Sequence, residues 1–146
     1  MIARSLLIPV AALALAASAW SQSDLAAQAA KEPGAQVTTS GLVFRSLKEG
    51  AGATPQASDK VRVNYRGTFA DGKEFDSSYS RGQPAEFPLD RVIKCWTEGV
   101  QRIKVGGKAK LTCPPAIAYG ERGAGGVIPP GATLQFEVEL LAIVGR

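Results

Sequence analysis

Histidine, the side chain that most often acts as a general acid or base in enzymes, is absent from the 146 residues of this sequence. Without histidine the chain cannot form Ser-His or Cys-His catalytic pairs, histidine-based zinc sites or a histidine-ligated haem. Its two cysteines are too few for a four-thiolate metal site. The composition therefore predicts a function that uses no metal and no cofactor, and a reaction without the usual general base.

Two polar segments suggest chemistry, and each also has a plain structural explanation. Residues 120–126 (GERGAGG) are glycine-rich, but they lack the Lys-Ser/Thr ending of a phosphate loop and lead to two prolines instead of a helix. This segment is interpreted as a mobile loop whose glycines permit turns. Asp76 precedes Ser77 and Ser78 at the end of an expected strand, an arrangement that most often forms a turn.

Residues 1–19 have the layout of a secretory signal peptide. Basic Arg4 is followed by an apolar run over residues 6–17 and an Ala-Ser-Ala cleavage pattern. A membrane anchor is the alternative, but the run is shorter than the roughly 18–20 residues of a span and contains Pro9. No cysteine follows the run to carry a lipid. We expect cleavage after Ala19, no stable membrane anchor after cleavage, and export to the periplasm, with extracellular release as the alternative.

Export has two consequences for function. An oxidising compartment makes Cys95 and Cys113 candidates for a disulfide, and two small buried hydrophobic side chains are an equally good interpretation. The formal net charge of +4 is dispersed along the chain. Because export also separates the protein from nucleic acids, nucleic-acid binding is not expected.

The exported chain divides into a tail and one domain. Residues 20–40 are rich in Ala, Gln and Ser, contain a Pro-Gly break and present no apolar stripe. A short helix over residues 23–31 would have nothing to bury, so the segment is predicted to be a flexible tail. Residues 41–146 are then the folded domain.

Strands and one helix are visible in the domain. Segments 61–66, 108–113 and 134–140 alternate apolar and polar residues as half-buried strands do. Asp71-Gly72 predicts a two-residue hairpin turn with positive φ angles.

The helix is predicted from an apolar stripe of Ile93, Trp96, Val100 and Ile103, ended by a Gly-Gly pair at 106–107. Hairpin-linked strands with one central helix indicate an antiparallel α+β domain. One face of the sheet would pack on the helix, and the other would carry charged residues.

Five motifs follow one another along the domain. They are VNYRG at 63–67, DGKEFDSS at 71–78, VIxxWxEG at 92–99, AYG at 118–120, and IPP at 128–130 leading to ATLxFxVELL at 132–141. Together they closely resemble the FKBP-type peptidyl-prolyl cis-trans isomerases, the macrolide-binding immunophilins. The resemblance implies isomerase activity and a five- to six-stranded antiparallel sheet curled around one short helix.

The resemblance also implies a pocket between the helix and the sheet. Its implied catalytic residues are Tyr65, Phe75, Asp76, Ile93, Trp96, Tyr119 and Phe136, and its implied substrate-binding residues are Arg81, Phe87, Val92, Val127 and Ile128. Trp96 would form the floor, while Val127 and Ile128 would lie on a loop over the mouth. Aromatic residues more often serve as plain core, but the polar tips of Tyr65, Asp76 and Tyr119 favour a ligand site.

An apolar pocket of this kind would disfavour a planar, polar amide more than a twisted one. The Tyr119 hydroxyl and the Ile93 backbone N–H would bond the carbonyls beside the rotating bond, and an Asp76–Arg81 pair would orient the carboxylate. The expected ligands are proline-containing unfolded or partly folded polypeptides, with rapamycin-like macrolides as inhibitors.

Three further expectations depend on the resemblance. Cys113 would lie on the strand beneath the helix that carries Cys95, so a disulfide would join helix to sheet. The alternative function is a peptide-binding module or folding chaperone that uses the same pocket without turnover; the joint presence of the implied catalytic residues favours the enzyme. The chain has no long N-terminal helical segment of the kind that larger exported relatives use to dimerise, so a monomer is expected.

Overall fold

The computed structural model describes residues 22–145, so the predicted signal peptide over residues 1–19 lies outside the described residues. The strands are β1 (Gln36–Val37), β2 (Val43–Lys48), β3 (Lys60–Thr68), β4 (Glu74–Ser77), β5 (Ala85–Pro88), β6 (Lys108–Cys113) and β7 (Leu134–Val144). The helices are α2 (Gln22–Ala30), α3 (Ser78–Arg81), α4 (Lys94–Val100) and the short 3-10 turns η1 (Leu89–Arg91) and η2 (Pro115–Ile117). Within residues 22–145, none of these helices is long and apolar enough to cross a membrane.

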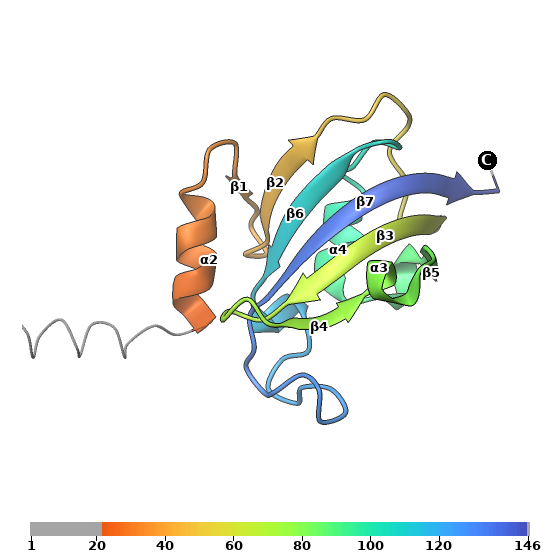
Figure 1. The fold of residues 1–146 in the computed structure, drawn as a ribbon. Helices are drawn as coiled ribbons and strands as arrows, with labels where there is room; N and C mark the ends of the chain where they lie inside the picture. The colour runs from red at the N-terminus through yellow and green to blue at the C-terminus, as the bar shows by residue number, and fades with distance from the viewer. Residues whose placement is uncertain (1–21, 146) are drawn as a thin grey trace, which may run out of the picture.

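The strands form one antiparallel sheet in the order β1-β2-β6-β7-β3-β4, with β5 also paired to β3. Figure 1 shows this sheet bending across α4, which lies behind it in that view. The predicted α+β class is confirmed. The sheet has seven strands instead of five or six, because β1 lies in the expected tail and four-residue β5 carries no clear alternation.

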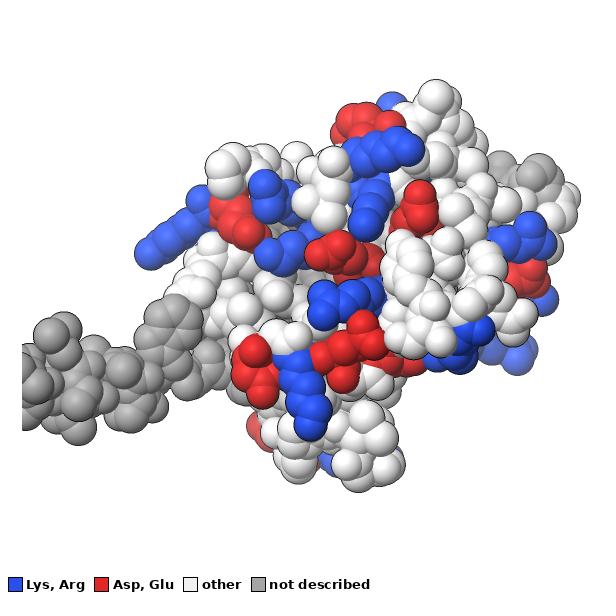
Figure 2. Space-filling model, viewed as in Figure 1, with Lys and Arg blue, Asp and Glu red and all other residues white. Residues whose placement is uncertain are grey.

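Strands β3 and β7 lie side by side in the sheet and show the predicted alternation of burial. The buried residues of β3 are Val61, Val63, Tyr65 and Gly67, and the side chains of the first three pack in one core with α4. The other face of β3 carries charges that find partners, such as Arg66 with Glu74 at 2.9 Å. In Figure 2 basic and acidic side chains are interspersed over this face.

Helix α4 begins after Ile93 and ends at Val100, before the predicted stop at residues 106–107. Beyond Val100 the backbone turns through tighter i→i+3 hydrogen bonds, one of which joins Ile103 N–H to Val100 O at 3.0 Å. Ile103 is still buried, so the apolar stripe continues after the backbone has left the helix.

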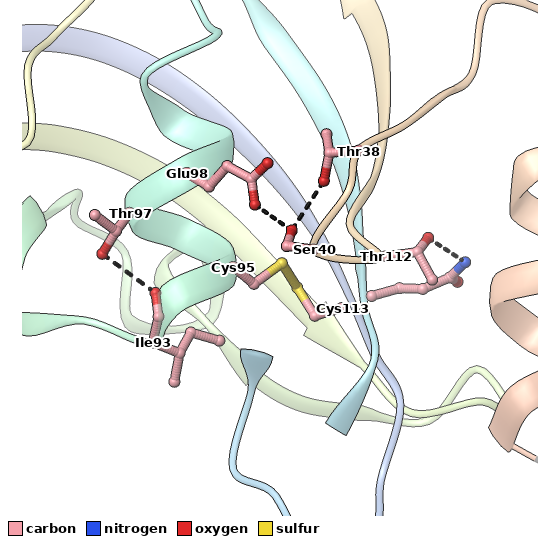
Figure 3. The surroundings of a disulfide bond; sticks show 9 residues. Thr38, Ser40, Ile93, Cys95, Thr97, Glu98, Thr112 and Cys113 are labelled. Carbon is pink, nitrogen blue, oxygen red and sulfur yellow. Dashed lines mark hydrogen bonds between the residues drawn. A yellow bond between two sulfur atoms is a disulfide. The ribbon is translucent and has the colours of Figure 1, made fainter. Parts of the chain in front are cut away.

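A disulfide between Cys95 and Cys113 joins α4 to β6, with the two Cα atoms 5.8 Å apart (Figure 3). Both cysteines are fully buried. One turn further along α4, Glu98 accepts a hydrogen bond of 2.5 Å from Ser40 Oγ, in the turn before β2. The helix is therefore fixed to the sheet region at two separate places.

The β3–β4 hairpin differs from the predicted two-residue turn. Gly72 has a positive φ of +87°, and no non-glycine among the described residues has one. Gly72 N–H donates to Phe69 O at 2.9 Å, and Phe69 N–H donates to Lys73 O at 2.9 Å. The loop is thus a β-turn followed by a left-handed glycine, which needs a positive φ at only one residue.

Residues 22–40, part of the segment predicted to be a flexible tail, carry α2 and β1 and contact the sheet. Ala29 of α2 is buried, and Glu32 just after the helix pairs with Lys110 of β6 at 3.0 Å. Arg45 of β2 contacts Glu32 at 3.4 Å and donates from Nε to Pro33 O at 3.0 Å. These contacts join the helix region to strands that come later in the chain. They hold α2 against the sheet although its sequence shows no apolar stripe.

Candidate active site

A cavity of about 470 Å³ lies between α4 and strands β3, β4, β5 and β7. Its lining residues are Tyr65, Phe75, Asp76, Phe87, Arg91, Val92, Ile93, Trp96, Tyr119 and Phe136. All of them except Arg91 belong to the set that the family resemblance implied. Apart from two tyrosine hydroxyls, one carboxylate and one guanidinium, the side chains of this wall are apolar or aromatic.

Trp96 lies at the base of this cavity and is 4% exposed. Its indole makes edge-to-face contacts with Tyr65, Phe87 and Phe136, with ring centroids 5.2, 5.4 and 5.4 Å apart. Perpendicular packing of this kind is favourable for aromatic rings and holds each ring at a fixed angle. The indole N–H is buried and has no hydrogen-bond partner within the described residues.

A β-bulge explains why two consecutive residues of β4 line the same cavity. Asp76 pairs with Gly67, and Glu74 pairs with the next residue of β3. Phe75 is therefore the extra residue, and a bulge re-aims such a side chain. Gly67 leaves room for its ring, because a Cβ there would lie 2.6 Å from Phe75 Cζ.

Two serines hold the turn that follows Asp76. Ser77 caps α3, its Oγ accepting from backbone N–H groups two and three residues ahead at 3.1 and 3.3 Å. Ser78 is buried, and its Oγ accepts from Tyr65 N–H at 2.9 Å. Because the two serine hydroxyls make the side-chain hydrogen bonds that hold this turn, the Asp76 carboxylate is free to lie in the cavity wall.

Tyr65, Asp76 and Arg81 form a closed hydrogen-bonded group, which we call the wall triad. The Tyr65 hydroxyl donates to Asp76 Oδ2 at 2.5 Å, and Arg81 donates to Asp76 Oδ1 at 2.6 Å. Arg81 also donates to the Tyr65 hydroxyl at 2.9 Å and lies 5.6 Å from the centre of its ring. Ser77 N–H donates to Asp76 Oδ1 as well, at 2.9 Å. Arg81 thus reaches the site through its partners and is absent from the cavity lining.

The wall triad favours an ionised carboxylate and a neutral phenol. Burial acts to raise the pKa of Asp76, but the hydrogen bonds from Tyr65 and Arg81 outweigh it, and the pKa falls below its ordinary value. Burial, followed by the hydrogen bond to Asp76, raises the pKa of Tyr65. A carboxylate with a lowered pKa is a poor general base near neutral pH, and the hydrogen bonds of Asp76 fix the positions of Tyr65 and Arg81.

The structure does not place Val127 and Ile128 over the mouth of this cavity. Neither residue lines it; Val127 is 57% exposed, while Ile128 is 6% exposed and packs in the core. Ala124 and Ile128 exchange two backbone hydrogen bonds, of 2.9 and 3.0 Å, which fold the loop back on itself. Both residues line a different hollow, described below.

Arg91 is the lining residue that sequence reasoning missed. It belongs to η1 and directly precedes Val92 and Ile93, so its neighbours were the available signal. Its side chain is exposed and makes no ion pair within the part of the chain that the structure describes. It therefore adds an uncommitted positive charge to the cavity.

The chain matches a family model described as "FKBP-type peptidyl-prolyl cis-trans isomerase" over residues 52–141. Every residue that lines the cavity falls within this match. The chain belongs to the FKBP-type peptidyl-prolyl cis-trans isomerase family. Helix α2 and strands β1 and β2 precede the matched FKBP segment.

Relatives within the FKBP family are similar in sequence and in fold. FkpA of Escherichia coli (strain K12) is 54% identical over 114 residues, which are 78% of this chain and 42% of FkpA. The crystal structure of FkpA from Escherichia coli matches with a TM-score of 0.77 and 44% identity, covering 97% of this chain and 70% of that one. A peptidyl-prolyl cis-trans isomerase from Pseudomonas syringae matches with a TM-score of 0.78 and 38% identity, covering 84% of this chain and 90% of that one. This chain spans less than half the length of the curated FkpA sequence.

Proposed function

We propose that this chain catalyses cis–trans rotation about Xaa-Pro bonds, with the cavity above Trp96 as its active site. The observation that carries the proposal is an aromatic hollow of about 470 Å³ in which Asp76 is already committed to Tyr65 and Arg81. A volume of this size lies in the range of small-ligand pockets and suits a prolyl ring with its flanking peptide groups. FKBP family membership supports the same assignment.

The rotation needs no nucleophile. The Xaa-Pro bond resists rotation because amide resonance makes it partly double, with a barrier of roughly 18–20 kcal/mol. Resonance and much of the charge separation of the amide are lost in the twisted transition state. Walls such as Phe75 and Phe136 disfavour the polar, planar amide more than the twisted one, so the barrier falls. A fall of about 7 kcal/mol corresponds to roughly a 10⁵-fold acceleration.

Two donors are proposed to hold the substrate carbonyls during rotation. The Tyr119 side chain is 40% exposed at the cavity, and among residues 22–145 its hydroxyl has no hydrogen-bond partner. The Ile93 N–H precedes the first turn of α4, and no carbonyl of the described residues accepts from it. Donors placed before the reaction stabilise a rotating amide without reorganising during the step.

The remaining residues are assigned supporting roles. Phe87, Val92 and Trp96 would contact the prolyl ring, and Arg81 would hold the wall triad in place. The same apolar walls are proposed to accept a rapamycin-like macrolide in competition with the peptide. The substrates are proposed to be proline-containing segments of unfolded or partly folded exported proteins.

The test is a coupled isomerisation assay on a short Xaa-Pro peptide. Phe75→Ala is expected to lower kcat/KM at least about tenfold, a loss of about 1.4 kcal/mol of transition-state stabilisation, because it removes one wall. Tyr119→Phe removes a single hydroxyl and is expected to cost about threefold to tenfold, the range of one neutral hydrogen bond. Tyr79→Phe is the matched control, since Tyr79 is 48% exposed and lies outside the cavity.

Rapamycin is expected to inhibit the wild-type protein. A folded protein that prevents aggregation of an unfolded client but turns over no peptide would replace this proposal with the peptide-binding alternative.

Export to the periplasm and a monomeric state belong to the same proposal. The sequence pattern of residues 1–19 supports export. Fractionation of cells that express the full chain, with mass measurement of the recovered protein, tests cleavage after Ala19. Sedimentation velocity of the recovered protein tests the monomer.

A further inference from the structure

A second hollow, of about 850 Å³, lies between α2, the β3–β4 loop and the loop over residues 120–131. We call it the flanking groove. Its apolar lining includes Leu25, Phe69, Ala70, Val127, Ile128 and Pro130. Val127 is 57% exposed, so its apolar side chain is open to solvent at the groove.

The flanking groove borders the cavity. Phe69 lines the groove, Phe75 lines the cavity, and their ring centroids are 4.8 Å apart. The chain also runs directly from one to the other, since Tyr119 lines the cavity and Arg122, in the loop that follows, lines the groove. An extended chain rises about 3.3 Å per residue, so a peptide leaving the cavity across Phe75 reaches the groove within about two to four residues.

The outer wall of the groove is helix α2, which lies outside the FKBP match over residues 52–141. This wall is held in place, because Ala29 is buried and Glu32 binds Lys110 through contacts of 3.0 and 3.2 Å. Leu25 and Gln28 face the groove from this helix. The groove is thus formed by the family domain together with a segment that precedes it.

Charges of both signs stand among the groove residues: Asp71, Lys73 and Arg122. A mixed set of this kind does not select a strongly acidic or basic ligand. An apolar interior with polar groups beside it fits one apolar side chain of an extended polypeptide, whose backbone amides stay hydrated at the rim.

We infer that the flanking groove binds an apolar side chain two to four residues from the proline whose bond the cavity rotates. The inference rests on the proposed isomerase function and extends its substrate class from a dipeptide unit to unfolded segments that carry an apolar residue near proline.

The test compares kcat/KM for three peptides with one Xaa-Pro core. One is a short peptide, one has extensions of leucine and valine on both sides, and one has extensions of serine and glycine of equal length. Wild-type protein is expected to favour the apolar extension over the polar one by about fivefold or more, a difference of about 1 kcal/mol. The short peptide measures the core reaction alone.

Leu25→Glu and Ala70→Glu place a charge in the groove and are expected to abolish the preference for the apolar extension. Their matched controls are Leu47→Glu and Ala57→Glu, at exposed positions away from the groove, which are expected to keep it. All four variants are expected to turn over the short peptide as the wild type does.

Equal kcat/KM for the two extended peptides in wild-type protein, with the short peptide turned over normally, would overturn the inference while leaving the isomerase function intact. A preference that survives in Leu25→Glu and Ala70→Glu would overturn it as well. Sedimentation velocity tests whether a second copy of the chain occupies the groove instead. A wild-type dimer that dissociates in Leu25→Glu would assign the groove to that second copy and overturn the inference. Failure of the folded wild type to turn over the short peptide would overturn the isomerase function, and the inference with it.

Discussion

Reducing the disulfide between Cys95 and Cys113 is expected to lower the free energy of unfolding by about 3 kcal/mol. The bond joins positions separated by 18 residues. In the chain-entropy description, cross-linking a loop of this size restricts the unfolded chain by roughly 3 kcal/mol at 25 °C. The effect therefore acts mainly on the unfolded state, and the folded cavity is expected to keep its shape.

Reduction isolates this effect better than substitution does. Cys95→Ala combined with Cys113→Ala also deletes two sulfur atoms from fully buried positions. Deleting buried atoms adds the cost of a cavity to the loss of the cross-link. The double variant is therefore expected to be less stable than the reduced wild type, and the difference between them measures packing alone.

The assay is guanidinium unfolding followed by tryptophan fluorescence, with and without reductant. Reduction is expected to lower the midpoint and to raise the slope m slightly, because the unfolded chain without its cross-link exposes more surface. Thiol labelling of unreduced protein is the control and is expected to modify neither cysteine. Two reactive thiols in unreduced protein, or a stability loss below about 1 kcal/mol on complete reduction, would refute the reasoning.

Three other substitutions have definite expected outcomes. Gly67→Ala would place a Cβ 2.6 Å from Phe75 Cζ; we expect a loss of about 1–3 kcal/mol by denaturant unfolding from overpacking. It should also lower kcat/KM by a larger factor than Gly99→Ala, whose Cβ would crowd the side chain of Leu111, a residue outside the cavity lining. Wild-type Arg91 is expected to favour a Glu-Pro peptide over a Lys-Pro peptide by about threefold in kcat/KM, the scale of an exposed charge pair. Arg91→Glu is expected to reverse this preference, and an unchanged preference would contradict a role for this charge. Asp76→Asn tests the lowered pKa: the stabilisation by the Asp76 carboxylate is full above its ordinary pKa of 3.8 and is lost as the pH falls through the lower folded value. Urea unfolding from pH 7 to pH 2.5 should therefore show the wild type losing its advantage over Asp76→Asn only below about pH 4, and an advantage that is constant across this range would contradict it.

The central strands could be predicted because local pattern and tertiary burial agree there. In β3 the buried residues alternate with polar ones along the whole strand, and one face packs on α4. The cavity residues come mainly from such segments, so motif spacing and fold place them together. The end of helix α4 could not be predicted in this way. The apolar stripe continues to Ile103, but the backbone hydrogen bonds have already changed from the α-helical pattern after Val100.

The missed features depend on contacts that no local pattern contains. Helix α2 is held by Glu32 and Lys110, which lie 78 residues apart in the chain. The loop that carries Val127 contains glycines with positive φ on both sides of Ala124, so its sequence allows several backbone conformations. The hydrogen bonds between Ala124 and Ile128 select one of them. Arg91 is an exposed charged residue, a type that sequence patterns leave unassigned.

The wall triad explains how a pocket can hold an ionised carboxylate and still present an apolar interior. Asp76 accepts from Tyr65, Arg81 and the Ser77 N–H, so both of its oxygens are occupied by donors from the wall itself. A carboxylate without these donors would draw water into the cavity, and water would stabilise the planar amide that the apolar walls are proposed to disfavour. The charge therefore helps to fix the phenol ring of Tyr65 against Trp96 at a centroid distance of 5.2 Å. In the proposed mechanism it takes no part in proton transfer. If this is correct, kcat/KM should stay level between about pH 5 and pH 9, because no group of the triad has an ordinary pKa in that interval. A bell-shaped profile would instead require a titrating acid or base that neither the sequence nor the cavity wall supplies.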